Sequence, residues 1–371
     1  MKYRDLRVGL VYLVLSLANA AARYGHVAFG DAAVDKDARN SYRPLAEAVN
    51  SGTPLYFDGA ATNKPPGFLL TDVGVESLGH YLPVFLLLVG LANFGAAVLL
   101  YRYVARSNWQ AGVVAGGVFL LALYPVSGYY VNVRSFAVLF LLGSLLASRP
   151  VVRGVLFAVA GLFTQYVVFL LPLVAAPVVS RAKFDARKVA TFCAGGVGVT
   201  ALAWGVVLGV WGTESVLAGL DWTYGLPTGV ETQPAWGDRT GIGGGTEPRS
   251  YLARSWLVAQ PGQWVARLGL HGAPIAPVVA GAALGAVRTM TCERSEFRVE
   301  LVAAGALAAV PFLVRALIDY WILPLPFFAA LAALYVTGDL AESGPEESAE
   351  ASSDETSGVQ NAGVADAPGR S

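Results

Sequence analysis

Long apolar runs alternate with short polar segments over the first 337 residues of the chain. A run of about 20 apolar residues is long enough to cross a bilayer as a helix. The clearest candidates are 8–23, 81–104, 110–128, 188–212, 272–288, 298–317 and 320–337. The run 135–147 is short, whereas the run 154–179 is long. The long run is predicted to turn near Thr164–Gln165. It would then form two short limbs or a re-entrant hairpin. The pattern predicts an all-α polytopic membrane protein with about ten membrane segments.

Lysine and arginine concentrate in the short connections between these runs. The basic patches are the N-terminus, 102–106, 149–153, 180–188 and 288–298. Because short basic loops stay on the cytoplasmic side, both termini are predicted to be cytoplasmic. Two large loops, 24–80 and 213–271, then lie on the outer face of the cell membrane.

The composition agrees with this class of protein. The chain is 55% hydrophobic and only 14% charged, whereas soluble domains carry about a quarter charged residues. Residues 338–371 differ from the rest, because they are acidic and rich in Ser, Gly and Ala, and they are predicted to form a disordered cytoplasmic tail. Cys193 and Cys292 give neither a disulfide framework nor a metal-binding spacing. We expect a transmembrane domain over 1–337 and no nucleic-acid partner.

A short amphipathic helix is predicted in the first outer loop, within 31–52. The apolar positions of one face are Tyr42, Leu45, Ala46 and Val49. Pro44 suits a first helical turn, and Gly52 suits the position just past a helix end. We expect this helix to lie in the membrane interface.

Asp35 and Asp37 precede this helix directly. The N-terminal dipole of a helix favours an ionised carboxylate by about 0.3–1 kcal/mol, and an ionised carboxylate can act as a general base. The alternatives are that the aspartates cap the helix or face water, or that they bind a metal.

The stretch NKPPG, residues 63–67, is predicted to form a rigid strut. Proline fixes its own φ near −65° and holds the preceding residue in an extended conformation, so Lys64 is expected on a stiff segment. A second interfacial helix is predicted to follow within 67–79. A rigid ammonium at the level of the lipid headgroups suits a phosphate, and the alternative is simple contact with anionic lipid.

The second outer loop and the last helices add basic and aromatic candidates. The glycine-rich stretch before Arg254 has the composition of a loop that closes over a substrate. The tryptophans of this loop either stack on sugars or belong to an aromatic belt at the interface. Arg315 and Asp319 either pair with each other on one helix face, or Arg315 lies near a phosphate.

Several of these motifs resemble a known family. The series Y…LAEAVNSG…PLYFDG…NKPPGFLL after an acidic cluster resembles the first outer loop of GT-C membrane glycosyltransferases. The nearest branch is that of protein O-mannosyltransferases and aminoarabinose transferases, including archaeal dolichyl-phosphate-mannose mannosyltransferases. The stretch RALIDYWILPLPFFAALAAL, residues 315–334, is similar to a late helix of the family, and GLFTQYVVFLLPLV resembles its short mid-chain helices.

The resemblance implies a hexosyltransferase that moves a sugar, mannose being the expected one, from a polyprenyl (dolichyl) phosphate donor. The acceptor would be a lipid-linked glycan or a protein on the outer face. An acidic residue of the first loop is essential in the family, and it is carried over to Asp37 or Asp35, with Asp37 preferred because it is nearer Tyr42. The family's usual Asp-Glu pair is replaced here by Asp35-Lys36-Asp37.

Residues of both outer loops and of the last helices are expected to bind the substrate. Lys64, with Arg254 or Arg315, would receive the lipid phosphate. Further substrate-binding candidates are Arg39, Tyr42, Arg43 and Tyr320. We expect no metal and no other cofactor. The alternatives are a transporter or flippase of lipid-linked saccharides, which would need ionisable residues in mid-membrane, and a catalytically inactive scaffold of the same fold.

Overall fold

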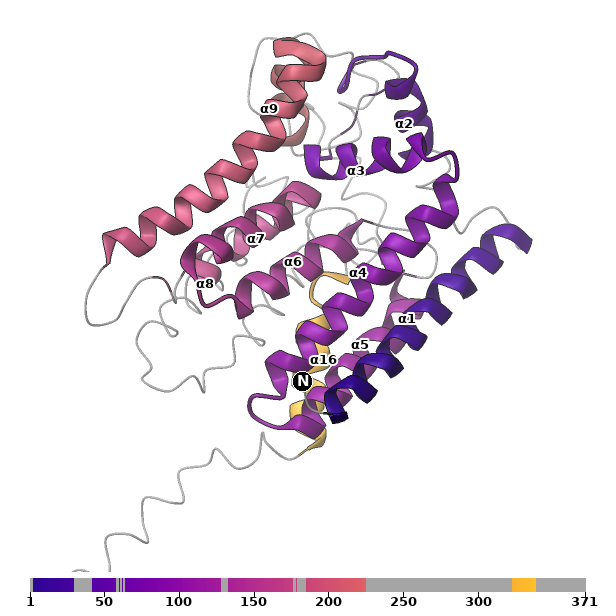
Figure 1. The fold of residues 1–371 in the computed structure, drawn as a ribbon, viewed down its shortest axis with the longest axis vertical. Helices are drawn as coiled ribbons and strands as arrows, with labels where there is room; N and C mark the ends of the chain where they lie inside the picture. The colour runs from indigo at the N-terminus through magenta and orange to yellow at the C-terminus, as the bar shows by residue number, and fades with distance from the viewer. Residues whose placement is uncertain are drawn as a thin grey trace, which may run out of the picture.

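The computed structural model describes residues 3–29, 42–57, 64–127, 133–175, 185–224 and 322–337, together with residues 60, 62 and 178. This part of the chain is helical and contains no strand (Figure 1). Its elements are α1 (Tyr3–Phe29), α2 (Arg43–Asn50), α3 (Pro66–Ser77), α4 (Tyr81–Val104), α5 (Trp109–Ser127), α6 (Arg134–Leu146), α7 (Pro150–Phe163), the 3₁₀ helix η2 (Gln165–Leu170), α8 (Leu171–Ala175), α9 (Ala186–Tyr224) and α16 (Leu325–Val336).

Three helices of the described part are long and apolar enough to cross a membrane. They are α1 over Tyr3–Gly25, α4 over Tyr81–Val104 and α9 over Ala186–Leu220. The apolar stretches of α5, α6, α7 and α16 have 12–15 residues, or about 18–23 Å of helix, against a hydrocarbon core of about 30 Å. The predicted all-helical class is confirmed for this part of a membrane protein. The number of segments stays a prediction, and the expected spans 272–288 and 298–317 lie outside the described residues.

Hydrophobicity located most helices of the described part within a few residues. The predicted span 81–104 coincides with α4, and α5 and α6 each differ by one residue from 110–128 and 135–147. Within the expected span 320–337, α16 covers Leu325–Val336, and a proline occupies its first turn.

The long run 154–179 turns as predicted. Helix α7 stops at Thr164, whose extended backbone (φ −155°, ψ 124°) ends the helical hydrogen bonding. The chain then returns through η2 and α8. The return brings the Val174 carbonyl next to the start of α7, where it accepts a hydrogen bond from Arg153 Nη1 at 3.3 Å. Two short limbs therefore replace a single crossing.

Helix α9 doubles back at Gly212. Gly212 has φ 83° and ψ 179°, a combination that essentially only glycine adopts. Gly219 consequently lies against Trp204, and a Cβ at Gly219 would stand 2.7 Å from that indole ring. The two residues would be about 22 Å apart in a straight helix. We call 186–211 the inner limb and 213–224 the outer limb.

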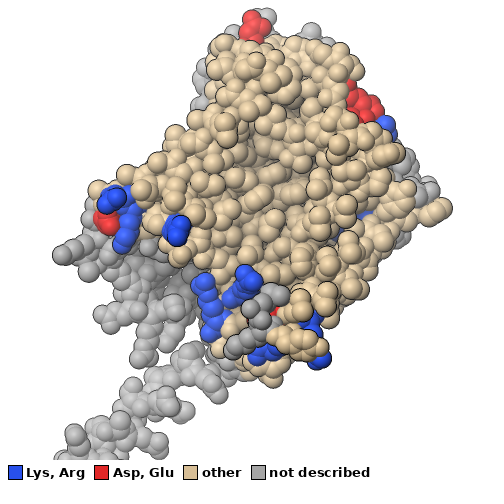
Figure 2. Space-filling model, viewed as in Figure 1, with Lys and Arg blue, Asp and Glu red and all other residues tan. Residues whose placement is uncertain are grey.

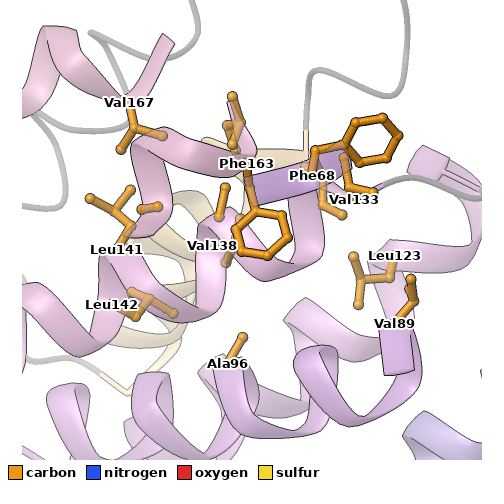
Figure 3. Close-up of a cluster of buried hydrophobic side chains, with 14 of the residues drawn as sticks. Phe68, Val89, Ala96, Leu123, Val133, Val138, Leu141, Leu142, Phe163 and Val167 are labelled. Carbon is orange, nitrogen blue, oxygen red and sulfur yellow. The ribbon is translucent and has the colours of Figure 1, made fainter. Parts of the chain in front are cut away.

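The helices pack around α4. Helices α1, α5 and α6 lie against α4, α7 lies between α6 and α9, and α2 and α3 pack together at one end of the bundle (Figure 1). Phe68 of α3 joins the apolar core of the bundle, where it lies among Val133, Val138 of α6 and Phe163 of α7 (Figure 3). Burial of Phe68 therefore fixes the first outer loop on the helices beneath it.

Charge is distributed unevenly over the surface. In Figure 2 the basic side chains gather at the end of the molecule that holds the N-terminus and the start of α9, and the broad face between the two ends carries little charge. Exposed basic residues occur in α1, at the end of α4 and just after it, just before α7, and at the start of α9. They are Arg4, Arg7, Arg102, Arg106, Arg149, Arg187 and Lys188. Two contacts hold this end together: Tyr101 Oη donates to Asp5 Oδ1 at 2.8 Å, and the Arg4 guanidinium lies 4.8 Å from the Trp109 ring.

Glycines allow α7 and α9 to approach each other closely. A Cβ at Gly154 would overlap the Phe192 carbonyl oxygen, and a Cβ at Gly195 would lie 2.5 Å from the Val151 carbonyl oxygen. Both obstacles are backbone atoms, which cannot rotate away as a side chain can. Small residues are a common means of bringing membrane helices together.

We predict that Gly154→Ala destabilises the protein by about 1–3 kcal/mol, because the methyl group forces α7 and α9 apart. The control is Gly161→Ala on the same helix, where an added Cβ meets nothing within 4 Å. Thermal unfolding in detergent checks both variants. An unchanged midpoint for Gly154→Ala would contradict this close approach of α7 and α9.

Candidate functional site

The predicted first outer loop contains the amphipathic helix that the sequence indicates, as α2. Leu45, Ala46 and Val49 of α2 are buried, and Gly52, with φ 99°, follows the helix end. Tyr42 is also buried, and its ring contacts Phe68 edge to face at a centroid distance of 4.7 Å. Helix α2 thus buries its apolar face mainly against α3. The placement of Tyr42 gives it a packing role, and its predicted contact with substrate stays a prediction.

Arg43 connects α2 to α3 through two carboxylates. Its Nε lies 2.9 Å from Glu47 Oε1 and 3.6 Å from Glu76 Oε2. The Arg43 and Glu47 side chains are about half exposed, so water weakens their attraction. The Arg43 side chain faces solvent beside α3, which leaves it accessible to a ligand.

Lys64 is fixed through its backbone. Its carbonyl oxygen accepts hydrogen bonds from Tyr56 Oη at 3.0 Å and Thr223 Oγ1 at 3.4 Å, and its amide donates to Thr62 Oγ1 at 3.3 Å. Pro65 is extended (φ −64°, ψ 158°) and precedes the first turn of α3. The strut predicted from the two prolines agrees with this geometry.

The strut rests on the end of α7. A Cβ at Gly67 would lie 2.7 Å from Leu162 Cβ and 2.9 Å from the Leu162 carbonyl oxygen. Glycine at the third position of the Pro-Pro-Gly run therefore lets α3 begin directly on α7. The backbone of Lys64 is held on one side by this contact and on the other by the outer limb of α9.

A buried carboxyl group lies in α3, outside the motifs that the sequence predicts to be functional. Asp72 is fully buried, the Tyr81 hydroxyl donates a hydrogen bond to its Oδ1, and its Oδ2 has no hydrogen-bond partner. Burial raises the pKa of Asp72 to about 7, against the lowering effect of the Tyr81 hydrogen bond and with a further increase from the Glu76 charge. Asp72 can therefore bind or release a proton near neutral pH.

A sequence signal for Asp72 was present. Asp72 shares the buried face of α3 with Phe68, Leu69 and Val75, three or four residues away, as helical periodicity places them. An acid on an otherwise apolar face indicates a buried titratable group. Its partner Tyr81 lies beyond the turn at Gly79 and could not be assigned from spacing.

The predicted site is described only in part. Tyr42, Arg43 and Lys64 all lie in the α2–α3 region. Asp35, Asp37, Arg39, Arg254, Arg315 and Tyr320 lie outside the described residues, as does the tail 338–371. The start of the second outer loop is helical as the outer limb of α9, and it contacts the first loop through Thr223.

Within the described part, His, Cys, Asp and Glu do not form any group of three that could hold a metal ion. The expectation that the protein works without a metal stays a prediction. The described residues offer Lys64, whose backbone is anchored on the strut before α3, an accessible Arg43 at the start of α2, and the buried carboxyl group of Asp72 in α3. The lysine and the arginine suit an anionic ligand.

Comparisons of the chain with protein-family models, with curated proteins and with solved structures each found no match.

Proposed function

We propose that this chain is a polytopic GT-C-type membrane glycosyltransferase that takes its sugar, expected to be mannose, from a polyprenyl-phosphate donor. The acceptor is a lipid-linked glycan or a protein on the outer face of the membrane. The observation that supports the proposal best is the anchored backbone of Lys64, which holds a lysine where the first outer loop meets the helix bundle. An anchored backbone limits the positions that the Lys64 ammonium can take, so less reorganisation is needed when a phosphate arrives.

The proposed reaction is a single displacement with inversion. Asp37, or Asp35 in its place, removes the proton of the acceptor hydroxyl, whose oxygen forms a bond to the anomeric carbon. The bond from that carbon to the phosphate oxygen breaks, and the electron pair leaves with the polyprenyl phosphate. Lys64, with Arg254 or Arg315, stabilises the departing phosphate. This chemistry needs no metal.

The proposed topology has about ten membrane segments with both termini in the cytoplasm. Exposed basic residues gather at the end with the N-terminus (Figure 2), and basic loops favour the cytoplasmic side. Helices α2 and α3 and the outer limb of α9 lie toward the opposite end of the bundle (Figure 1). The outer loops would then meet the donor's headgroup at the outer membrane surface.

Mass spectrometry of surface glycans tests this function. A strain lacking the gene is expected to lose one sugar from a glycan, and the wild-type gene is expected to restore it. A Lys64→Met gene is expected to restore little, whereas Lys188→Met, at the opposite end, is expected to restore it fully. Unchanged glycans in the deletion strain would contradict the proposal.

A further inference from the structure

Tyr56 adopts a conformation that few residues other than glycine adopt. Its φ is 72°, in the left-handed region where a Cβ is disfavoured. The side chain is nonetheless fully buried. Such a conformation persists where the surrounding contacts impose it, and it frequently marks a functional constraint.

The contacts around the Tyr56 ring come from both limbs of α9. The ring stacks on Trp204 of the inner limb, with centroids 5.9 Å apart and an interplanar angle of 20°. A Cβ at Gly219 of the outer limb would lie 2.5 Å from Tyr56 Cε2. The reversal of α9 at Gly212 therefore creates the place in which this ring fits.

The Tyr56 hydroxyl reaches Lys64, eight positions along the chain. It donates to the Lys64 carbonyl at 3.0 Å, and Thr223 of the outer limb donates to the same oxygen at 3.4 Å. Backbone hydrogen bonds close the turn from Tyr56 to Ala60. The Tyr56 amide donates to the Ala60 carbonyl at 3.2 Å, and the Ala60 amide donates to the Phe57 carbonyl at 2.8 Å. Tyr56 thus connects the fold of α9 to the backbone of Lys64.

We propose that Tyr56 is a positioning residue that holds Lys64 in register with the outer limb of α9 for binding a lipid phosphate. This inference rests on the proposed function, because it takes the Lys64 ammonium as the phosphate ligand. Tyr56 acts through the Lys64 backbone and does not itself touch the phosphate. Thr223 acts on the same carbonyl, so the first and second outer loops share one anchor.

Binding of a polyprenyl phosphate to the protein in nanodiscs of neutral lipid tests the inference. Tyr56→Phe removes the hydroxyl and keeps the stacked ring, and it is expected to weaken binding about 3–10-fold, the effect of one lost hydrogen bond. In a Lys64→Met background the same substitution is expected to have no further effect, because non-additivity identifies residues that act together. In a transfer assay, Tyr56→Phe is expected to raise KM for the donor and to lower kcat, because Lys64 also stabilises the departing phosphate.

Tyr12→Phe is the matched control. Tyr12 is also buried, and its hydroxyl donates to the Val113 carbonyl at 2.8 Å, but it lies on α1 against α5. Its loss is expected to leave binding unchanged. If Tyr56→Phe fails to fold, Thr223→Val serves as the second variant, with a weakening of about 2–5-fold expected for this longer hydrogen bond.

The outcomes separate the two proposals. If the wild-type protein does not bind the lipid, or binds it as well with Lys64→Met, the phosphate role of Lys64 in the proposed function is overturned. If Lys64→Met weakens binding while Tyr56→Phe and Thr223→Val leave it unchanged, only the positioning role of Tyr56 is overturned. A full Tyr56→Phe effect in the Lys64→Met background also overturns that role.

Discussion

Asp37→Asn is expected to lower sugar transfer about 100- to 10,000-fold, the usual contribution of a general base. Asparagine keeps the size and shape of aspartate, but its neutral amide cannot take a proton from the acceptor hydroxyl. Donor binding is expected to change little, because Lys64 and the arginines carry the proposed contacts with the phosphate. Single-turnover transfer of a labelled sugar measures the rate, and binding of polyprenyl phosphate measures the donor contact.

Two further variants are compared with Asp37→Asn. Asp35→Asn shows which aspartate is the base, and Glu214→Gln provides an exposed acid of the outer limb whose loss is expected to have no effect. If the double variant Asp35→Asn/Asp37→Asn still transfers sugar, the proposed mechanism is wrong. A transporter, a flippase or an inactive scaffold would keep its function in that double variant. Labelling that places residues 31–66 in the cytoplasm would equally contradict the proposal.

Asp72→Asn is expected to remove most of the pH dependence of folding stability between about pH 4 and pH 7. The pKa of Asp72 rises from 3.8 to about 7 in the folded protein, so in this range the folded state binds more protons than the unfolded state. Stability therefore falls as pH rises through the window and stays low above it. The shift corresponds to roughly 4 kcal/mol at most.

The groups around Asp72 define the control for this experiment. They are Tyr81 at the start of α4 and Glu76 on α3, with Arg43 of α2 next to Glu76. Thermal unfolding in detergent from pH 4 to pH 8 is expected to show a falling midpoint in the wild type and a flatter profile in Asp72→Asn. Asp185→Asn, which changes a partly exposed acid at the opposite end, is expected to keep the wild-type slope. Equal slopes in the wild type and Asp72→Asn would show that Asp72 does not cause the pH dependence.

The sequence located features that depend on neighbouring residues. Helix α2 followed from the spacing of Leu45 and Val49, and the start of α3 followed from Pro65 and Pro66. The turn at Thr164 followed from two basic flanks around one long apolar run. Periodicity and proline geometry act over a few residues, so a linear pattern contains them.

Other features of the candidate site depend on contacts between distant segments. The predicted span 188–212 ends where α9 reverses, but no pattern around Gly212 predicts that the helix resumes there and folds back on itself. The stretch PLYFDG gave no reason to connect Tyr56 with Trp204, and NKPPG gave none to connect Lys64 with Thr223, 159 positions away. Such contacts form only when the reversed helix meets the first loop.

By itself, the sequence determined that the protein is helical and apolar enough for a membrane, where most described helices begin and end, and that two prolines connect Lys64 to the next helix. Only the tertiary structure decided that Asp72 is buried beside Tyr81 and that Tyr56 and Thr223 share the Lys64 carbonyl. The physical reason is that helix formation and proline stiffness are local, whereas burial of a carboxyl group and hydrogen bonding to a distant carbonyl require the packed chain.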